Sequence, residues 1–257
     1  TSRAAWRWRA GRGGSFSHEQ VDGYTYETEG GLPVNPGDRG RYLDMALDAS
    51  DRPHIAYHDL EETSLMYATF DGTEWATETL DGTSGSDSVG TFNSIALDGS
   101  GNPAIAYYDA GEKALKIAYY SAGWVDEVVD EGELLADGIA AELDEPDVGK
   151  YAHLVIDGTT YWIAYYDVAN GNLKMAHGTP GAWTIETLAG DGDGDRGAWP
   201  YLYVESATVL RVAFQDVGEQ DLLVGRYEAG VLNWVAVDTG DFVGADSVIA
   251  SVGSGLR

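Results

Sequence analysis

The sequence PAIAYYD at 103–109 decides the fold, because close copies of it recur along the chain. The other copies are PHIAYHD at 53–59, YWIAYYD at 161–167 and LRVAFQD at 210–216. Each copy is rich in β-branched and aromatic residues, and turn sequences such as DGSGNP at 98–103 bound it, which is typical of strands joined by hairpins. Four copies of one strand indicate a repeat architecture.

Each copy is the second of four strand-like segments that recur in a fixed order. The first segment begins at a glycine, and these glycines are Gly40, Gly90, Gly149, Gly197 and Gly244. The third segment carries a leucine six residues after the aspartate of PAIAYYD, and the fourth begins with Trp75, Trp124, Trp183 or Trp234. Four strands that recur every 47 to 59 residues are the pattern of a β-propeller blade, which buries both its faces only between neighbouring blades.

The sequence therefore predicts an all-β, single-domain, five-bladed β-propeller. Its four complete blades are expected at 40–89, 90–148, 149–196 and 197–243, and a composite fifth blade at 244–257 with 1–39. In the composite blade, AAWRWRAG at 4–11 fits the third strand and FSHEQVDG at 16–23 fits the fourth. The second strand of that blade has no counterpart. The sequence is incomplete there, or the blade has three strands and a groove, or another molecule donates the strand by β-addition.

Charge and composition limit the classes of partner. The chain has 43 acidic and 15 basic residues, a net charge of -28, so it repels nucleic acid and anionic membranes. Such a surface suits solubility, divalent cations or a cationic partner. There are no cysteines, and no apolar run approaches the roughly 18 residues of a membrane helix. The chain begins at Thr1 without a signal peptide, so we expect that processing removed one or that the sequence is an excerpt.

Aspartates precede each first strand and are candidates for a calcium site. They are Asp38, Asp87, Asp147, Asp195 and Asp241. Five carboxylates around one mouth of a channel would attract Ca²⁺, although each could instead form an Asx turn. The sequence DGDGD, with Asp191, Asp193 and Asp195, resembles the start of a calcium loop. It is not an EF-hand, because Arg196 and Leu202 stand where that loop needs glycine and glutamate.

Positions that vary between repeats are free of the demands of the blade and are candidates for a binding site. Near the channel axis these are Asp44, Asn93, His153 and Tyr201. Asp44 and His153 are weak candidates for an acid–base pair, and a water-filled channel is the plainer interpretation. The invariant aspartates Asp59, Asp109, Asp167 and Asp216 are expected to fix hairpin turns, and the four tryptophans to pack between blades. His58 and His177 are interpreted as surface residues.

The repeat SIALDGSGNPAIAYYDAGEKALKIAYYSAGWVDEVVD at 94–130 resembles propeller repeats found in large secreted or surface proteins of myxobacteria and related bacteria. The resemblance covers nearly the whole chain and implies an extracellular or cell-surface protein. By blade number the domain is also similar to tachylectin-type lectins and arabinanase-type glycosidases. The glycosidases need three carboxylates in the channel, whereas only Asp44 is acidic among the varying channel positions, and the sugar-binding repeats of tachylectin-type proteins are missing.

Three functions follow from these patterns. The first is a non-catalytic extracellular module that binds protein or glycan, with calcium as a stabilising ion. The second is a hydrolase acting on polysaccharide, with Asp44, His153 and the acidic loop at 144–147 as its residues. The third is a structural domain of a larger surface protein.

Overall fold

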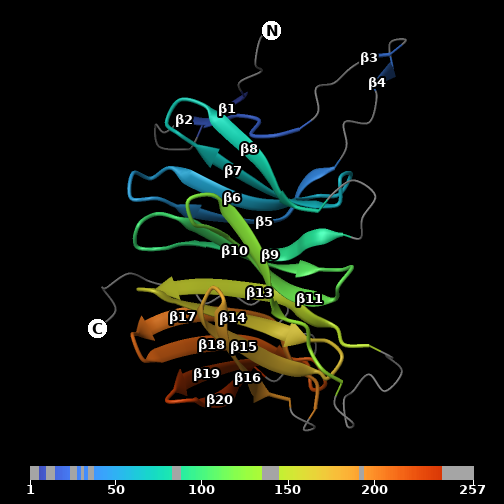
Figure 1. Cartoon of the computed structure of the whole chain (residues 1–257), viewed down its shortest axis with the longest axis vertical. Coiled ribbons are helices and arrows are strands. Elements are labelled where there is room, and N and C mark those ends of the chain that lie inside the picture. The colour runs from blue at the N-terminus through green and yellow to red at the C-terminus, as the bar shows by residue number, and fades with distance from the viewer. Residues whose placement is uncertain are drawn as a thin grey trace.

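The computed structural model contains strands and no helix in the residues that it describes (Figure 1). These residues are 6–9, 15–23, 28–29, 32–33, 38–82, 88–134, 145–190 and 194–238. Sixteen of the strands form four antiparallel sheets, each a meander of four strands in chain order. The described residues contain no helix with the length and apolarity needed to span a membrane.

We name the four sheets blades 1 to 4. Blade 1 contains β5 (Arg39–Leu47), β6 (Pro53–Asp59), β7 (Ser64–Phe70) and β8 (Trp75–Asp81). Blade 2 contains β9 (Val89–Leu97), β10 (Pro103–Asp109), β11 (Ala114–Tyr120) and β12 (Trp124–Asp130). Blade 3 contains β13 (Val148–Asp157), β14 (Thr160–Asp167), β15 (Asn172–Thr179) and β16 (Ala182–Ala189). Blade 4 contains β17 (Arg196–Ser206), β18 (Val209–Asp216), β19 (Asp221–Glu228) and β20 (Val231–Asp238). The four-stranded repeat predicted from the sequence is thus confirmed.

The N-terminal residues form two small hairpins. β1 (Trp6–Arg9) pairs with β2 (Ser15–His18), and β3 (Thr28–Glu29) pairs with β4 (Leu32–Pro33). The first hairpin falls where the third and fourth strands of the composite blade are expected. The remaining segment of that blade, 244–257, lies outside the described residues, so the number of five blades stays a prediction.

Glycine allows each blade to approach the one before it. The first glycine of blades 2, 3 and 4 has a positive φ of 90°, 110° or 131°. A Cβ atom at Gly90, Gly149 or Gly197 would lie 2.4–2.7 Å from the backbone of the leucine that is the second residue of the preceding blade's third strand. These leucines, Leu65, Leu115 and Leu173, are fully buried. Only glycine fits both the left-handed backbone and this contact.

A buried polar cluster joins blade 1 to blade 2 and blade 2 to blade 3. At the first interface, the Asp81 carboxylate accepts a hydrogen bond of 2.5 Å from the Tyr107 hydroxyl and pairs with Lys116 Nζ at 2.7 Å. At the second, Asp130 contacts Tyr165 at 2.7 Å and Lys174 at 2.6 Å. At the interface of blades 3 and 4 the corresponding residues are Ala189, Phe214 and Leu223, which pack as apolar neighbours. The residues at these three positions therefore differ as a set: two interfaces have Asp, Tyr and Lys, and the third has Ala, Phe and Leu.

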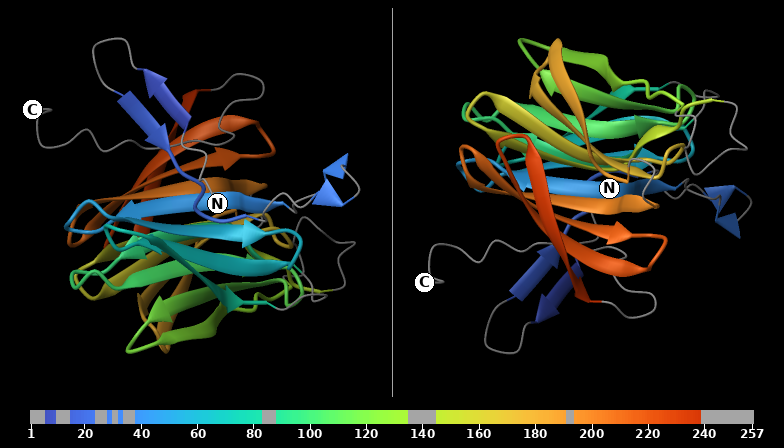
Figure 2. Two further views of the ribbon diagram at one scale, coloured as in Figure 1. Left: turned by 90° about the horizontal axis from the view of Figure 1, so that it is seen from above. Right: turned by 90° about the horizontal axis from the view of Figure 1, so that it is seen from below.

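The N-terminal segment contacts blade 1 in the same way. The Asp22 carboxylate accepts a hydrogen bond of 2.5 Å from Tyr57, as Asp81 does from Tyr107, and Arg39 Nη1 takes the place of the lysine at 2.8 Å. Val21 packs against the cluster that contains Tyr57. Residues 21–22 therefore occupy the position of the end of a fourth strand beside blade 1. Figure 2 shows the hairpin of β1 and β2 and the four blades from two further directions.

One face of β5 differs from its counterparts. We call the face formed by Leu43, Met45 and Leu47 the seam face. These side chains are 62%, 54% and 55% exposed. At the position of Met45, the other blades place Ile95, Leu154 and Leu202 with exposures of only 5%, 2% and 1%. The preceding blade covers those three residues, while the described part of the chain leaves the seam face open.

Candidate functional site

A β-bulge in each first strand builds the candidate site. In blade 1, Arg41 pairs with His58 and Asp44 with Ala56, so the strand carries one extra residue between them. The other three first strands show the same shift at the same distance from their glycine. Bulges re-aim side chains and recur beside functional sites. Here they carry two residues of each first strand toward the channel.

An aromatic residue in the left-handed region occupies the bulge in all four blades. We call these residues the collar, and they are Tyr42, Phe92, Tyr151 and Trp199, with φ of 51°, 51°, 57° and 48°. Such a backbone is strained for a bulky side chain and persists only where the surroundings hold it. Neighbouring rings in the collar lie 4.8, 4.6 and 4.6 Å apart between centroids. Tyr42 is exposed and the other three rings are partly exposed.

The collar surrounds a cavity of about 390 Å³, which we call the channel mouth. The two residues that follow each collar residue complete its lining, and they are Leu43, Asp44, Asn93, Ser94, Ala152, His153, Pro200 and Tyr201. The structure therefore brings together all four residues that the sequence predicts to bind a ligand: Asp44, Asn93, His153 and Tyr201.

We call the polar side chains of the lining the polar ring: Asp44, Asn93, Ser94, His153 and Tyr201. Three of them also join neighbouring blades, a role that the sequence interpretation missed. Asp44 Oδ2 accepts a hydrogen bond of 2.9 Å from the Ile95 amide of blade 2. Ser94 Oγ accepts one of 3.1 Å from the Leu154 amide of blade 3, and His153 Nδ1 accepts one of 3.2 Å from the Leu202 amide of blade 4. The expectation that these positions are free of the blade's demands was wrong. Asp44, Ser94 and His153 each supply an acceptor to the next blade, so the side chain at these three positions can vary only among acceptors.

The carboxylate of Asp44 accepts three hydrogen bonds, all from neutral donors. Its Oδ1 accepts the Met45 amide at 2.8 Å, and its Oδ2 also accepts the Ser94 hydroxyl at 3.0 Å. Among the described residues, no Lys or Arg forms an ion pair with Asp44. These hydrogen bonds hold the carboxylate rigidly inside the channel mouth.

His153 is a neutral acceptor. Burial lowers the pKa of its imidazole to about 4, against a smaller opposing effect of the Asp44 carboxylate. Its ring lies 3.8 Å from the ring of Tyr201 between centroids. Because the Leu202 amide donates to Nδ1, the proton of the neutral ring resides on Nε2. No hydrogen bond joins Asp44 to His153 within the described residues, which leaves the predicted acid–base pair without direct contact.

Asn93 is buried, with 8% exposure. Its amide nitrogen donates a hydrogen bond of 2.9 Å to the Gly90 carbonyl. Its Oδ1 atom is buried and has no hydrogen-bond partner among the described residues. A buried acceptor left unpaired costs about 1–3 kcal/mol, so Asn93 is the polar group of the channel mouth with the most to gain from a bound donor.

The described members of the predicted calcium ring have other partners. Asp38 pairs with Arg41 at 2.5 Å, and Asp147 accepts from Tyr108 at 2.7 Å and from Lys150 at 2.8 Å. Asp195 accepts from Tyr166, and burial raises the pKa of its carboxyl. The described part of the chain has no group of three or more metal-ligating side chains. Asp87, Asp191, Asp193 and Asp241 lie outside the described residues, so calcium binding there stays a prediction.

Other predicted roles have mixed outcomes. The turn role of the invariant aspartates is confirmed, since Asp59 Oδ1 accepts the amides of Glu61 and Glu62, and the other copies accept equivalent amides. Trp124 and Trp183 donate to Glu78 and Glu127 of the preceding blade, as packing between blades requires.

The interpretation of His58 as a surface residue was wrong. His58 is fully buried and bridges the Val89 carbonyl at 2.9 Å and the Ser88 hydroxyl at 3.1 Å. In the next two blades a tyrosine–aspartate pair, Tyr108–Asp147 or Tyr166–Asp195, makes the same connection. His177 is partly exposed and stacks on Trp162.

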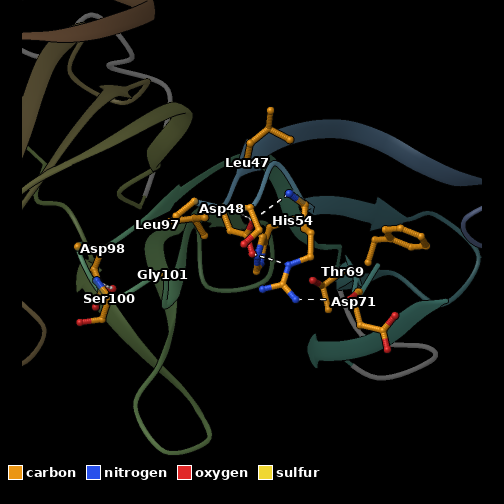
Figure 3. A pocket seen from close by; sticks show the side chains of 14 residues that line it. Leu47, Asp48, His54, Thr69, Asp71, Leu97, Asp98, Ser100 and Gly101 are labelled. Carbon is orange, nitrogen blue, oxygen red and sulfur yellow. Dashed lines mark hydrogen bonds and ion pairs between the residues drawn. The ribbon is translucent and has the colours of Figure 1, made fainter. Parts of the chain in front are cut away.

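A second cavity, of about 600 Å³, lies between the turns of blades 1 and 2 at the other ends of their first strands (Figure 3). Asp48 and His54 line one wall, and Asp98 and Ser100 line the opposite one. Both aspartates are consumed by their own turns. Asp48 accepts the Ser50 and Arg52 amides, and Asp98 accepts the Ser100 and Asn102 amides, all at 2.8 Å. This cavity is therefore a groove between turns whose carboxylates are already paired.

Together, the four meander blades, their radial contacts and the channel mouth define a β-propeller with a candidate ligand site at one end of its channel. No protein-family model matches the sequence, and no curated protein matches it.

Solved structures confirm the propeller fold class. One neighbour is the α-L-arabinofuranosidase of Fusarium graminearum in complex with arabinobiose, with a TM-score of 0.54, 8% identity, and 77% of this chain and 66% of that chain covered. Another is the Aleuria aurantia lectin in complex with Fucα1-6GlcNAc, with a TM-score of 0.52, 14% identity, and coverage of 90% and 70%. A third is the Hadza microbial sialidase Hz136, with a TM-score of 0.52, 13% identity and coverage of 78%. The chain spans about half, 47%, of that sialidase.

The collar is the part of the site that the sequence interpretation overlooked. Its signal was present, because an aromatic residue stands two positions after the glycine in GRY, GTF, GKY and GAW. The prediction used only the positions that differ between repeats. The collar position is aromatic in all four blades but is not the same residue, being Tyr, Phe, Tyr and Trp. It was therefore counted neither as an invariant structural position nor as a variable binding position.

Proposed function

We propose that this protein is a non-catalytic glycan-binding propeller whose site is the channel mouth. The observation that carries the proposal is the collar of four partly exposed rings held above a ring of polar side chains. Aromatic faces pack against the apolar faces of sugar rings, and a few fixed polar groups read the hydroxyls. The neighbours among solved structures include a lectin and a glycosidase in complex with sugars, which supports a glycan over a protein ligand.

The number of carboxylates in the channel mouth favours binding over hydrolysis. Most glycosidases use two carboxyl groups on either side of the scissile bond. Asp44 is the only carboxylate that lines the channel mouth among the described residues, and both its oxygens accept hydrogen bonds within the protein. His153 is neutral and its Nδ1 is occupied. These features argue against the alternative of a polysaccharide hydrolase.

The finer architecture and location belong to the same proposal. We infer that 244–252 forms the first strand of a fifth blade completed by the N-terminal hairpin, since Asp22 and Val21 already contact blade 1 as a fourth strand would. An acidic chain built of these repeats suits an extracellular or surface protein with glycan partners. Calcium in the aspartate loops and a second strand donated by another chain are further parts of this proposal.

A glycan array followed by titration calorimetry tests the function. We expect binding to a defined set of glycans and a loss of affinity of about tenfold in Trp199→Ala, since one aromatic contact contributes about 0.5–1.5 kcal/mol. Tyr120→Ala is the matched control, because Tyr120 is a 43% exposed aromatic at the end of β11 and away from the channel mouth. Unchanged affinity in Trp199→Ala, or equal losses in both variants, would contradict the proposal.

A further inference from the structure

We propose that the channel mouth selects glycans that carry a free, protonated amino group, so that its ligand is an amino sugar and not a neutral or acidic one. This inference rests on the proposed function and specifies its ligand class. It follows from the Asp44 carboxylate and the aromatic rings that line the channel mouth.

The walls of the channel mouth favour a cation. Aromatic rings present a negative π face, and a cation within about 6 Å of a ring centroid gains about 0.5–2 kcal/mol. Tyr42, Phe92, Tyr151 and Trp199 bring four such rings to one opening, with neighbouring centroids no more than 4.8 Å apart. An ammonium group at this opening would contact more than one ring at the same time.

The base of the channel mouth carries an uncompensated negative charge. Asp44 accepts hydrogen bonds only from two backbone amides and the Ser94 hydroxyl, and these neutral donors hold its carboxylate without cancelling the charge. The described lining contains no Lys or Arg. His153 adds no positive charge, because burial keeps its imidazole neutral at physiological pH. A carboxylate behind aromatic walls is a site for a cation.

The basic side chains near the opening do not reverse this preference. Arg41 and Lys150 each follow the glycine that precedes the bulge, but they pair with Asp38 at 2.5 Å and with Asp147 at 2.8 Å. The net charge of -28 further attracts cations toward the protein and repels acidic sugars. Long-range and local electrostatics therefore act in the same direction.

Three trisaccharide probes test the inference by calorimetry on the full chain: the glucosamine trimer, the N-acetylglucosamine trimer and the galacturonic acid trimer. We expect the glucosamine trimer to bind at least tenfold more tightly than the other two. Its affinity should fall as salt is raised from low to physiological concentration, while that of the N-acetylated trimer should not change. Asp44→Asn should lower the affinity for glucosamine by about tenfold, with retained folding checked by thermal melting. Glu74→Gln, which removes a charge from an exposed turn of blade 1, is the control for net charge.

The outcomes separate this inference from the proposed function. If the N-acetylated trimer binds as tightly as glucosamine and loses affinity in Trp199→Ala, the glycan site stands and the cation preference is overturned. Tighter binding of the galacturonic acid trimer would overturn it as well. If no trimer and no arrayed glycan binds, both proposals fail.

Discussion

The two faces of blade 1 differ in what covers them: one packs against blade 2, and the other is open among the described residues. Toward blade 2 it presents Leu65, which is fully buried against Gly90. On its other side, Gly40 has no atom of the described residues within 4 Å of a Cβ, and Met45 is 54% exposed. Each blade thus contributes one side of two interfaces, and it buries both its faces only when both neighbouring blades are present.

The hydrogen bonds of the two faces show the same difference. The amides of Ile95, Leu154 and Leu202 each donate to a side chain of the preceding blade. The Met45 amide instead donates to Asp44 of its own strand. In the fifth repeat the residue aligned with Asp44 is Val248, which has no side-chain acceptor. Asp44 therefore satisfies an amide that a fifth blade could not, which supports our proposal that 244–252 is the strand that faces β5.

The largest effect should come from adding one methyl group at a tight interface. Gly197→Ala places a Cβ 2.4 Å from the Leu173 backbone nitrogen, at a φ of 131°. We expect it to lower the free energy of unfolding by about 4 kcal/mol or to prevent folding, through steric overlap and backbone strain. Gly40→Ala, with a φ of 90° and no atom of the described residues within 4 Å of its Cβ, should cost only about 1 kcal/mol for the backbone. Urea denaturation measures both, and equal losses would show that the interface contact does not matter.

The buried charge cluster offers the next test, because the protein contains its own apolar alternative. Asp130→Ala leaves Lys174, whose side chain is 8% exposed, without its partner, and should cost about 3–5 kcal/mol. The triple variant Asp130→Ala, Tyr165→Phe, Lys174→Leu copies the Ala189, Phe214 and Leu223 set of the next interface. We expect it to recover stability to within about 1 kcal/mol of the parent chain, measured by the same denaturation. A triple variant no more stable than Asp130→Ala would show that the sets cannot be exchanged.

The comparison also shows what the sequence could and could not predict. Strand order, hairpins and turn aspartates follow from local patterns, which is why the four described blades were found. The convergence of Asp44, Asn93, His153 and Tyr201 followed from counting along each repeat. The role of Asp44, Ser94 and His153 as acceptors for amides of the next blade could not be predicted, because it depends on backbone amides whose positions the sequence does not specify.

Two further features were misread or overlooked in the sequence. His58 was interpreted as a surface residue because it departs from tyrosine, yet a histidine with Ser88 spans the space that Tyr108 spans with Asp147. The collar was missed because its residues lie in a bulge, where the alternation of inward and outward side chains fails. The role of His58 depends on a pair of positions in different blades, whereas the collar depends on a local irregularity within each first strand.

A truncation cycle sharpens the comparison at the seam face. If 244–252 covers Met45, then Met45→Ala should cost about 2 kcal/mol in the full chain and close to zero after removal of 244–257. Leu202→Ala, at the equivalent position facing blade 3, should cost about 3 kcal/mol in both backgrounds, since that residue is 1% exposed. The cycle is measured by urea denaturation of the four variants and two parents. The same cost for Met45→Ala in both backgrounds would contradict the fifth blade.

The smallest expected effect is a pH dependence confined to the polar ring. The pKa of His153 is about 4 in the folded protein and about 6.5 in the unfolded chain, so the unfolded chain binds more protons between these values. The stability that neutral His153 contributes is fully present above pH 6.5 and is lost as the pH falls toward 4, by about 2 kcal/mol. His153→Ser should remove this part of the dependence, because a serine offers Leu202 a non-titrating acceptor as Ser94 offers Leu154. Denaturation at pH 7 and pH 4.5 measures the difference, and an unchanged pH slope in His153→Ser would show that the imidazole is already charged in the fold.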